Sequence, residues 1–247
     1  APGKFKSVIR ASLQELGSLH WPYLAGASVY PVQMAVRFRV PLIIWGAHQG
    51  LDQVGMFSHH DRVEMTRRYR REHDLMGVEP EMLVDANASF TEQSLQSFFY
   101  PTDNELSSIG VRGIYLNNFV RWDSKSQHEL MIKLYGYKLA LQARSFDTYN
   151  DIHDAHYSGT HDFIKFQKFG FSKATDHACR ELRFGRLNRE QARDLADQYE
   201  AVYPDDLEKF LAWIGWSEIE FMKCIDRVRD LSAWHQSSDG TWQRTGS

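Results

Sequence analysis

The sequence predicts an α/β chain in which part of a parallel-sheet domain precedes a mainly helical region. The first observation is a continuous apolar run, PLIIWG at residues 41–46, with the pattern of a strand covered on both faces of a parallel sheet. The second is the helical spacing of apolar residues before this run, and the third is a series of helix-start signals after it. We place the α/β portion in residues 1–75, the helical region in 76–236 and a flexible polar tail in 237–247.

Two helices are expected ahead of the strand. The second spans roughly residues 24–38, and the first has apolar residues on one side, namely Val8, Ile9, Leu13 and Leu16. No later run repeats the pattern of PLIIWG, although IYL at 114–116 fits either a short strand or a buried turn. We therefore expect the sheet to be completed by another chain or by residues that precede the given sequence.

Helix starts after the strand are marked by capping boxes, in which an N-cap side chain and the side chain three residues later bond to each other's backbone N–H groups. The six candidates are Ser89 with Glu92, Thr102 with Glu105, Ser124 with Gln127, Asn188 with Gln191, Asp205 with Glu208, and Ser217 with Glu220. The last three head the segments NREQARDLADQYE, DDLEKFLAWIGW and SEIEFMKCIDRVRDLS. Apolar residues recur on one face of these segments, which predicts three packed C-terminal helices.

Composition argues against several classes of function. The 247 residues carry a net charge of −3 with acidic and basic residues interspersed, which argues against nucleic acid as a partner. The basic run RVEMTRRYRREHD at 62–74 is either a solvated helix face or an anion contact. The two cysteines, Cys179 and Cys224, form no CxxC motif, and no apolar run has the roughly 20 residues of a membrane span. We expect a cytoplasmic protein with no membrane partner.

The segment that follows the apolar run is a candidate ligand-binding loop. In doubly wound sheets, ligands bind beyond the carboxyl ends of the strands. Gly46 lets the backbone approach a ligand closely, and the next residues offer donors, acceptors and a carboxylate: His48, Gln49, Asp52 and Gln53. The alternative is that these side chains only cap the next helix.

Three long segments carry a resemblance to a known family. HWPYLAGASVYPVQMAVRFRVPLIIWGAHQGLDQVGMFSH, at 20–59, resembles the middle of the N-acetyl sugar amidotransferases. The resemblance continues through YPTDNELSSIGVRGIYLNNFVRWDSKSQHELMIKLYGY at 100–137, and through TYNDIHDAHYSGTHDFIKFQKFGFSKATDHACRELRFGRLNREQA at 148–192. These enzymes of bacterial surface-polysaccharide synthesis belong to the ATP-pyrophosphatase-loop (PP-loop) superfamily. The string QVGMFSH is similar to the subgroup that acts in O-antigen lipopolysaccharide synthesis.

The resemblance implies an adenine-nucleotide-hydrolase-like domain and a C–N ligase type of reaction. ATP, with Mg²⁺, activates an acetamido carbonyl of a nucleotide-linked sugar, and ammonia from a glutaminase/cyclase pair then displaces AMP to leave an acetamidino group. On this basis Asp52 would hold Mg²⁺ and His48 would contact phosphate or act as acid or base, so both are candidate catalytic residues. Gly46, Gln49 and Gln53 are the candidate cofactor-binding residues. A homo-oligomer remains one of the open alternatives.

The sequence departs from the family in two ways. No string of the Ser-Gly-Gly-x-Asp-Ser type, the family's nucleotide loop, occurs in the given residues. His20 and Tyr23 stand where members tend to have two cysteines, and one histidine with one tyrosine cannot form a closed zinc site. The alternative function is therefore that of a truncated, non-catalytic paralogue that binds the sugar nucleotide or the glutaminase.

Residues with the chemistry for sugar or phosphate recognition occur further along the chain. Arginine forks pair with carboxylates and phosphates, and sugar sites often combine an aromatic wall with amide side chains. The candidate substrate-binding residues are Arg112, Asn117, Trp122, His161, Asp176, Arg180 and Arg183. For Asp176, Arg180 and Arg183, an internal salt-bridge network is the alternative.

A cluster of histidines leaves three interpretations open. His153, His156 and His161 are close enough in sequence for a metal site, but their spacing matches no strong ligand template. A polar pocket wall and hydrogen-bonded structural histidines are the other two interpretations.

Overall fold

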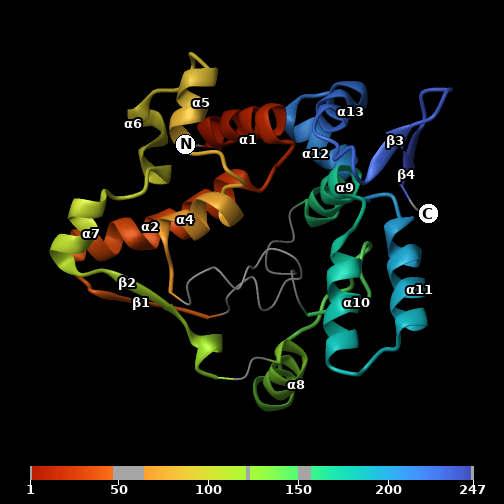
Figure 1. Cartoon of the computed structure of the whole chain (residues 1–247), viewed down its shortest axis with the longest axis horizontal. Coiled ribbons are helices and arrows are strands. Elements are labelled where there is room, and N and C mark those ends of the chain that lie inside the picture. The colour runs from red at the N-terminus through yellow and green to blue at the C-terminus, as the bar shows by residue number, and fades with distance from the viewer. Residues whose placement is uncertain (1, 47–63, 121–122, 150–156, 246–247) are drawn as a thin grey trace. The chain divides into compact units, whose positions relative to one another are not determined.

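The computed structural model describes residues 2–46, 64–120, 123–149 and 157–245 (Figure 1). The chain forms two compact units, residues 1–122 and 123–247, each described here by itself. The division lies after residue 122, whereas the sequence pattern predicts a helical region that starts at residue 76. Both strands of the parallel sheet belong to the first unit.

The first unit consists of helices around a two-stranded sheet. Its longer helices are α1 (Pro2–Leu16), α2 (Trp21–Phe38), α5 (Pro80–Ala86) and α7 (Asp103–Ile109). Its short helical turns are α4 (Arg67–Tyr69), the π-helical η1 (Arg70–Asp74), α6 (Glu92–Leu95), and the 3-10 turns η2 (Gln96–Phe98) and η3 (Leu116–Asn118). The strands are β1 (Leu42–Trp45) and β2 (Arg112–Tyr115).

The apolar stripe of the first helix is confirmed and forms part of the core. Val8, Ile9 and Leu13 are buried, and Leu16 is partly buried. The helix packs with α2, whose Trp21 is fully buried and donates from Nε1 to the carbonyl oxygen of Val78 at 3.0 Å. The α2 helix begins three residues before the expected start at residue 24. Pro22 is tolerated there because the first turn of a helix needs no intrahelical N–H donor.

The PLIIWG segment forms a parallel strand, as predicted, and its partner lies downstream. In the register, Leu42 faces Arg112 and Trp45 faces Tyr115. The expectation that no downstream residues pair with this strand is wrong, because the partner is the segment RGIY. Position 113 of this segment requires glycine, because a Cβ there would lie 2.7 Å from the Cβ of Met65. The prediction that both faces of this strand are covered is wrong, because Leu42 and Ile44, on one face of β1, are 47% and 62% exposed.

The second unit is mainly helical and ends in a hairpin. Its helices are α8 (Ser124–Tyr135), α9 (Ser158–Phe169), α10 (Lys173–Arg183), α11 (Arg189–Glu200), α12 (Leu207–Ile214) and α13 (Glu218–Arg227). Helices α10 and α11 lie side by side, and α9 packs against α12 and α13 (Figure 1). Strands β3 (Trp234–Gln236) and β4 (Trp242–Arg244) pair antiparallel, so part of the segment expected to be a flexible tail is an ordered strand.

Three of the six capping boxes form as predicted, and three do not. Thr102 with Glu105, Asn188 with Gln191, and Ser217 with Glu220 exchange the expected hydrogen bonds. Helix α6 is instead capped by Thr91, and α8 begins after Asp123. The N-cap of α12 is Asp206, whose side chain does not bond to that helix.

No helix in the described ranges is both long enough and apolar enough to cross a membrane.

Candidate functional site

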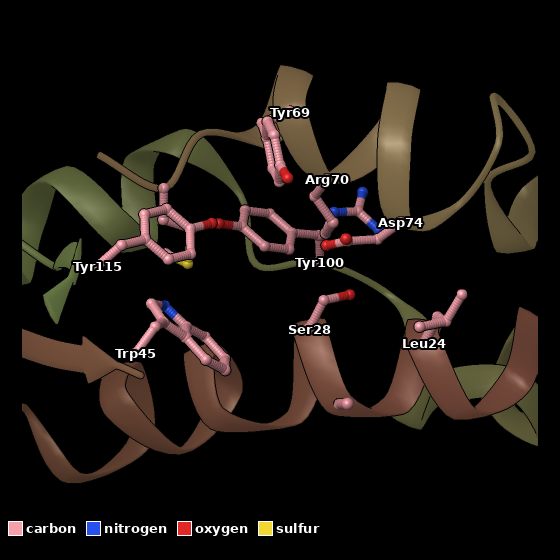
Figure 2. Close-up of a pocket in the computed structure, with 10 residues that line it drawn as sticks. Leu24, Ser28, Trp45, Tyr69, Arg70, Asp74, Tyr100 and Tyr115 are labelled. Carbon is pink, nitrogen blue, oxygen red and sulfur yellow. The ribbon is translucent and has the colours of Figure 1, made fainter. Parts of the chain in front are cut away.

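A cavity lies beside the carboxyl ends of the two parallel strands (Figure 2). Trp45 and Tyr115, the last residues of β1 and β2, both contribute to its wall. Its volume is about 110 Å³, and it is lined by Leu24, Ala27, Ser28, Trp45, Met65, Tyr69, Arg70, Asp74, Tyr100 and Tyr115. Helix α2 supplies one wall, and the α4–η1 turn supplies another. Ligand sites in parallel sheets favour this edge, so this cavity is the candidate site.

Arg70 is the buried cation of the cavity. Its side chain is 2% exposed, and its Nη2 donates to both carboxylate oxygens of Glu79 at 2.7 and 2.6 Å. The guanidinium carbon lies 4.5 Å from the centre of the Tyr100 ring. Nε and Nη1 of Arg70 are buried and have no hydrogen-bond partner in the described chain. Unsatisfied buried donors are costly, so these nitrogens favour a bound acceptor.

Asp74 supplies a half-buried carboxyl group next to this arginine. Burial raises the pKa of Asp74 to about 6, although the nearby Arg70 and His73 favour the charged form. Burial also raises the pKa of Tyr100 and of Tyr115, so both phenols stay protonated at neutral pH. The cavity therefore combines an acidic group with hydroxyls that remain neutral.

The strand ends add further polar atoms. The indole Nε1 of Trp45 is buried without a hydrogen-bond partner in the described residues. Just beyond β2, the side-chain amide of Asn117 is likewise buried and unpartnered there, and its backbone N–H donates to the carbonyl of Gly46 at 3.3 Å. The structure thus brings together two residues named from the sequence, Gly46 and Asn117.

Arg112 lies at the other end of the sheet. It is the first residue of β2, opposite Leu42, whereas Gly46 follows the last residue of β1. Its exposed guanidinium forms an ion pair with Glu64, which raises the pKa of Arg112 through the hydrogen bond and the charge. The structure does not bring Arg112 to the cavity, and its assignment to a substrate stays a prediction.

Several residues named from the sequence lie outside the described ranges. They are the candidate catalytic, metal-binding and cofactor-binding residues His48, Gln49, Asp52 and Gln53, together with Trp122, His153 and His156. Their roles stay predictions. Among the described residues, no group of three or more His, Cys, Asp or Glu side chains is placed to hold a metal ion.

The remaining candidates lie in the second unit and take part in local contacts. Arg180 is buried and pairs with Asp147 at 2.5 Å and with Glu181 at 3.1 Å. Asp176 forms an ion pair with Lys165, and burial raises the pKa of Asp176. Arg183 is exposed, and His161 is partly buried in the first turn of α9. The contacts of Arg180 and Asp176 fit the salt-bridge alternative, and a role in substrate binding stays a prediction for all four residues.

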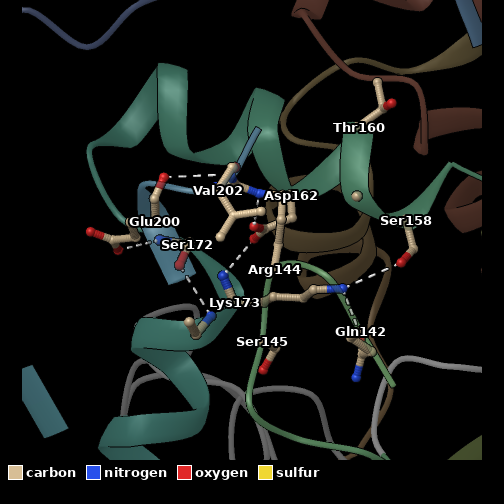
Figure 3. Close-up of polar contacts among 12 residues, drawn as sticks. Gln142, Arg144, Ser145, Ser158, Thr160, Asp162, Ser172, Lys173, Glu200 and Val202 are labelled. Atoms are coloured by element: carbon tan, nitrogen blue, oxygen red, sulfur yellow. Dashed lines mark hydrogen bonds and ion pairs between the residues drawn. The ribbon is translucent and has the colours of Figure 1, made fainter. Parts of the chain in front are cut away.

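A buried polar network joins α9, α10 and α11 to the segment before α9 (Figure 3). Arg144 Nε donates to Asp162 Oδ2 at 2.8 Å, with both side chains at most 1% exposed. The backbone N–H of Lys173 donates to Asp162 Oδ1 at 2.6 Å, and its Nζ donates to Gln142 Oε1 at 2.7 Å. Glu200 Oε1 accepts from the backbone N–H of Ser172 at 3.0 Å. These buried hydrogen bonds stabilise the packing of the three helices.

Ser145, His177 and Asp147 lie close together but do not form a catalytic triad. Ser145 Oγ lies 2.6 Å from His177 Nδ1, and Asp147 Oδ2 lies 4.0 Å from the same nitrogen. In a triad the serine and the carboxylate occupy different ring nitrogens. Since Ser145 is also only 2% exposed, this cluster fits a structural role.

The polar network occupies a segment that a family model recognises. Residues 143–246 match the model described as LPS biosynthesis protein WbpG-like, C-terminal domain. The match begins directly before Arg144, so the matched segment contains most of the buried network as well as the terminal hairpin. A search of curated proteins finds no match.

The central residues of the cavity are not among the candidates that the sequence patterns indicate. Tyr69, Arg70 and Asp74 lie in the basic run at 62–74, where a solvated face and an anion contact were the two interpretations. Arg68 and Arg71 are exposed, whereas Tyr69 and Arg70 are buried. A tyrosine within a run of arginines was the one available signal, because aromatic side chains rarely face solvent fully.

Proposed function

We propose that this chain is part of an ATP-dependent N-acetyl sugar amidotransferase that acts in bacterial O-antigen synthesis. The observation that carries the proposal is the WbpG-like C-terminal domain, which connects the chain with LPS biosynthesis. In the proposed reaction, the acetamido oxygen of a nucleotide-linked sugar leaves with AMP, and ammonia supplies the new nitrogen of the acetamidino group. A partner glutaminase provides the ammonia.

The arrangement of the first unit supports this proposal. A parallel strand pair ends at Trp45 and Tyr115, with a cavity beside these ends and Gly46 immediately after. We propose an adenine-nucleotide-hydrolase-like fold for this unit, in which this edge of the sheet faces the reaction. ATP would supply the activating group for the amide oxygen. Asp52 would hold Mg²⁺, and His48 would contact phosphate or transfer a proton.

The test is an assay of conversion of acetamido to acetamidino sugar nucleotide, followed by mass spectrometry. The chain is joined to a preceding segment that carries a nucleotide loop and is supplied with ATP, Mg²⁺, sugar nucleotide and ammonium. Asp52→Asn is expected to lower turnover by roughly 10²- to 10³-fold, the effect of losing one transition-state contact of ~3–4 kcal/mol. His48→Ala is expected to act in the same direction.

Asp205→Asn is the control, because Asp205 is an exposed carboxylate in the second unit. Near-normal turnover of folded Asp52→Asn and His48→Ala variants would mean that the loop only caps a helix. If the protein bound the sugar nucleotide or the glutaminase but produced no acetamidino product, the non-catalytic alternative would replace the proposal.

A further inference from the structure

We propose that helix α8 pairs antiparallel with the α8 helix of a second copy of this chain, about a two-fold axis near Ile132. The contact is made by an exposed row of apolar side chains, Leu130, Met131 and Leu134, which we call the α8 stripe. The pairing uses only surface residues of the second unit, so it does not depend on the proposed amidotransferase activity.

Helix α8 places its leucines on the outside. Among the helices described in the second unit, it alone buries no apolar side chain, and its one buried residue is Ser124. On the inner side, His128 Nδ1 lies 2.6 Å from the carbonyl oxygen of Ser124, and the His128 ring stacks on Tyr149 at 4.9 Å. Helix α8 does not pack lengthwise along another helix of its unit (Figure 1). Polar and aromatic contacts therefore hold this helix in place, and its leucines are left without apolar neighbours to cover them.

The α8 stripe has the spacing of a helix contact face. Leu130 and Leu134 are one turn apart and are 53% and 57% exposed, and Met131 lies beside them on the same side of the helix. In an amphipathic helix, residues at this spacing face an apolar neighbour. Exposed apolar side chains continue past the stripe to the end of the helix and beyond it: Tyr135, Tyr137, Leu139 and Leu141.

The exposed area is large enough for a stable interface. The side chains of the stripe and of the four residues that continue it are between 38% and 93% exposed. With about 150–250 Å² for a large side chain, this exposure amounts to on the order of 800 Å². The largest apolar patch of a typical monomer covers about 300–600 Å², whereas each partner of a standard interface buries about 800 Å². The area on one copy therefore matches what one subunit of a dimer contributes.

The stripe is complementary to itself in one orientation. Leu130 and Leu134 lie at equal distances before and after Ile132 in the helix. An antiparallel pair with its two-fold axis at Ile132 therefore places Leu130 of one copy against Leu134 of the other, and the reverse. Each leucine is covered by a leucine. The same patch is used by both copies, which is the isologous contact that closes a dimer.

The charges beside the stripe favour a second copy in this orientation. Glu129 and Lys133 are exposed, and each directly precedes a leucine of the stripe, so both lie on the same flank. In the antiparallel pair equal flanks meet, and Glu129 of one copy lies within about 3 Å, along the helix axis, of Lys133 of the other. In a parallel pair these flanks lie on opposite sides of the contact. A flank with one acid and one base does not attract a strongly acidic or basic protein, whereas a second copy provides an opposite charge for each residue.

The test is sedimentation velocity of the full chain at protein concentrations from about 1 to about 200 μM. The mass is expected to rise from 28.8 kDa toward twice this value, with a dissociation constant in about the micromolar range. Leu134→Glu places two carboxylates in the contact and is expected to weaken pairing at least about tenfold. Ile219→Glu is the matched control, because Ile219 is a 69% exposed apolar residue of α13. Circular dichroism checks that both variants are folded.

Charge reversal tests the orientation of the two helices. Glu129→Lys and Lys133→Glu each place like charges opposite one another in the antiparallel pair, and each is expected to weaken pairing about fivefold. The double variant Glu129→Lys/Lys133→Glu restores opposite charges and is expected to pair within about twofold of the unchanged chain. Non-specific association through exposed leucines would not show this recovery.

A mass of 28.8 kDa at every concentration would overturn the proposal. Equal effects of Leu134→Glu and Ile219→Glu, assemblies larger than a dimer, or a double charge variant that pairs as weakly as the single ones would overturn it as well. If Leu134→Glu left the mass unchanged but removed binding of the glutaminase, the stripe would belong to that partner instead. The measurement needs neither ATP nor sugar nucleotide. Loss of the pairing would therefore leave the proposed function standing, and a lack of amidotransferase activity would leave the pairing standing.

Discussion

The carboxylate of Asp206 caps α9 through Thr160, a residue of its first turn that lies 46 positions earlier in the chain. Its Oδ1 accepts from the backbone N–H of Thr160 at 2.8 Å and from its hydroxyl at 2.7 Å. Its Oδ2 accepts from the N–H of Gly159 at 3.0 Å. Tyr157, at the N-cap position of α9, provides no side-chain cap. The sequence pattern named Asp205 as the cap of α12, whereas the N-cap residue there is Asp206, and its side chain stabilises α9 instead.

Asp206→Ala is expected to lower the free energy of unfolding by about 2–3 kcal/mol. The substitution removes three hydrogen bonds to a charged acceptor at a helix N-terminus, more than an ordinary cap provides. Urea denaturation followed by circular dichroism measures the change. Asp205→Ala is the matched control. Asp205 is the residue next to Asp206 and its carboxylate is exposed, so its loss should change the free energy of unfolding by less than about 0.5 kcal/mol. Equal effects of the two substitutions would contradict the capping role of Asp206.

Asp162→Ala is expected to destabilise the second unit by about 3–5 kcal/mol. The substitution leaves the guanidinium of Arg144 buried without its carboxylate and leaves the N–H of Lys173 without an acceptor. Asp197→Ala is the control, because Asp197 is 57% exposed and its pair with Arg244 spans 3.6 Å. That exposed pair should contribute at most about 1 kcal/mol. Thermal or urea unfolding of both variants decides the comparison.

Asp74 is expected to make the protein less stable as the pH rises from about 4 to about 6. Burial raises its pKa from 3.8 to about 6, so in this window the folded protein holds a proton that the unfolded chain has lost. The free energy of unfolding therefore falls with rising pH. Above this window the whole decrease, at most about 3 kcal/mol, has taken place.

Asp74→Asn removes this titration. Urea midpoints measured in steps across the window should show a stability advantage of the variant that grows with pH and then levels off. Asp85→Asn, which changes an exposed carboxylate of the same unit, is the control. An advantage of Asp74→Asn that is constant from acid to neutral pH would show that Asp74 does not titrate differently in the folded state.

Ser217→Ala is expected to cost about 1 kcal/mol, the usual value of a helix N-cap. Ser217 Oγ accepts from the N–H of Glu220 at 3.3 Å, and Glu220 Oε2 accepts from the N–H of Ser217 at 2.8 Å. The hydrogen bonds that the carboxylate of Glu220 accepts from the backbone N–H and from the hydroxyl of Ser217 lower the pKa of Glu220. Ser217→Thr keeps a capping hydroxyl and should retain most of the stability, as measured by the denaturation midpoint. An unchanged midpoint in Ser217→Ala would rule out a stabilising cap.

Local sequence patterns predicted the parts of the fold that depend on neighbouring residues. Thr102, Asn188 and Ser217 cap their helices as expected, because both partners of each capping box lie within one turn. The first helix, the second helix and the PLIIWG strand also follow from apolar spacing over a few residues. The buried contacts of Arg180 agree with one of the two interpretations that its sequence spacing allowed.

The sequence by itself therefore determined the two N-terminal helices, the three helices from residue 189 onward, the parallel strand at 42–45 and the segments that resemble sugar amidotransferases. Only the tertiary structure decided that Arg112–Tyr115 pairs with that strand, that Asp206 caps α9 and that Arg70 lies buried beside Asp74. The physical reason is distance along the chain. Periodicity and capping are set by residues within a few positions, whereas strand pairing, distant caps and buried charges depend on groups tens of residues apart. The free energy of these interactions becomes favourable only after folding has brought the distant partner groups together.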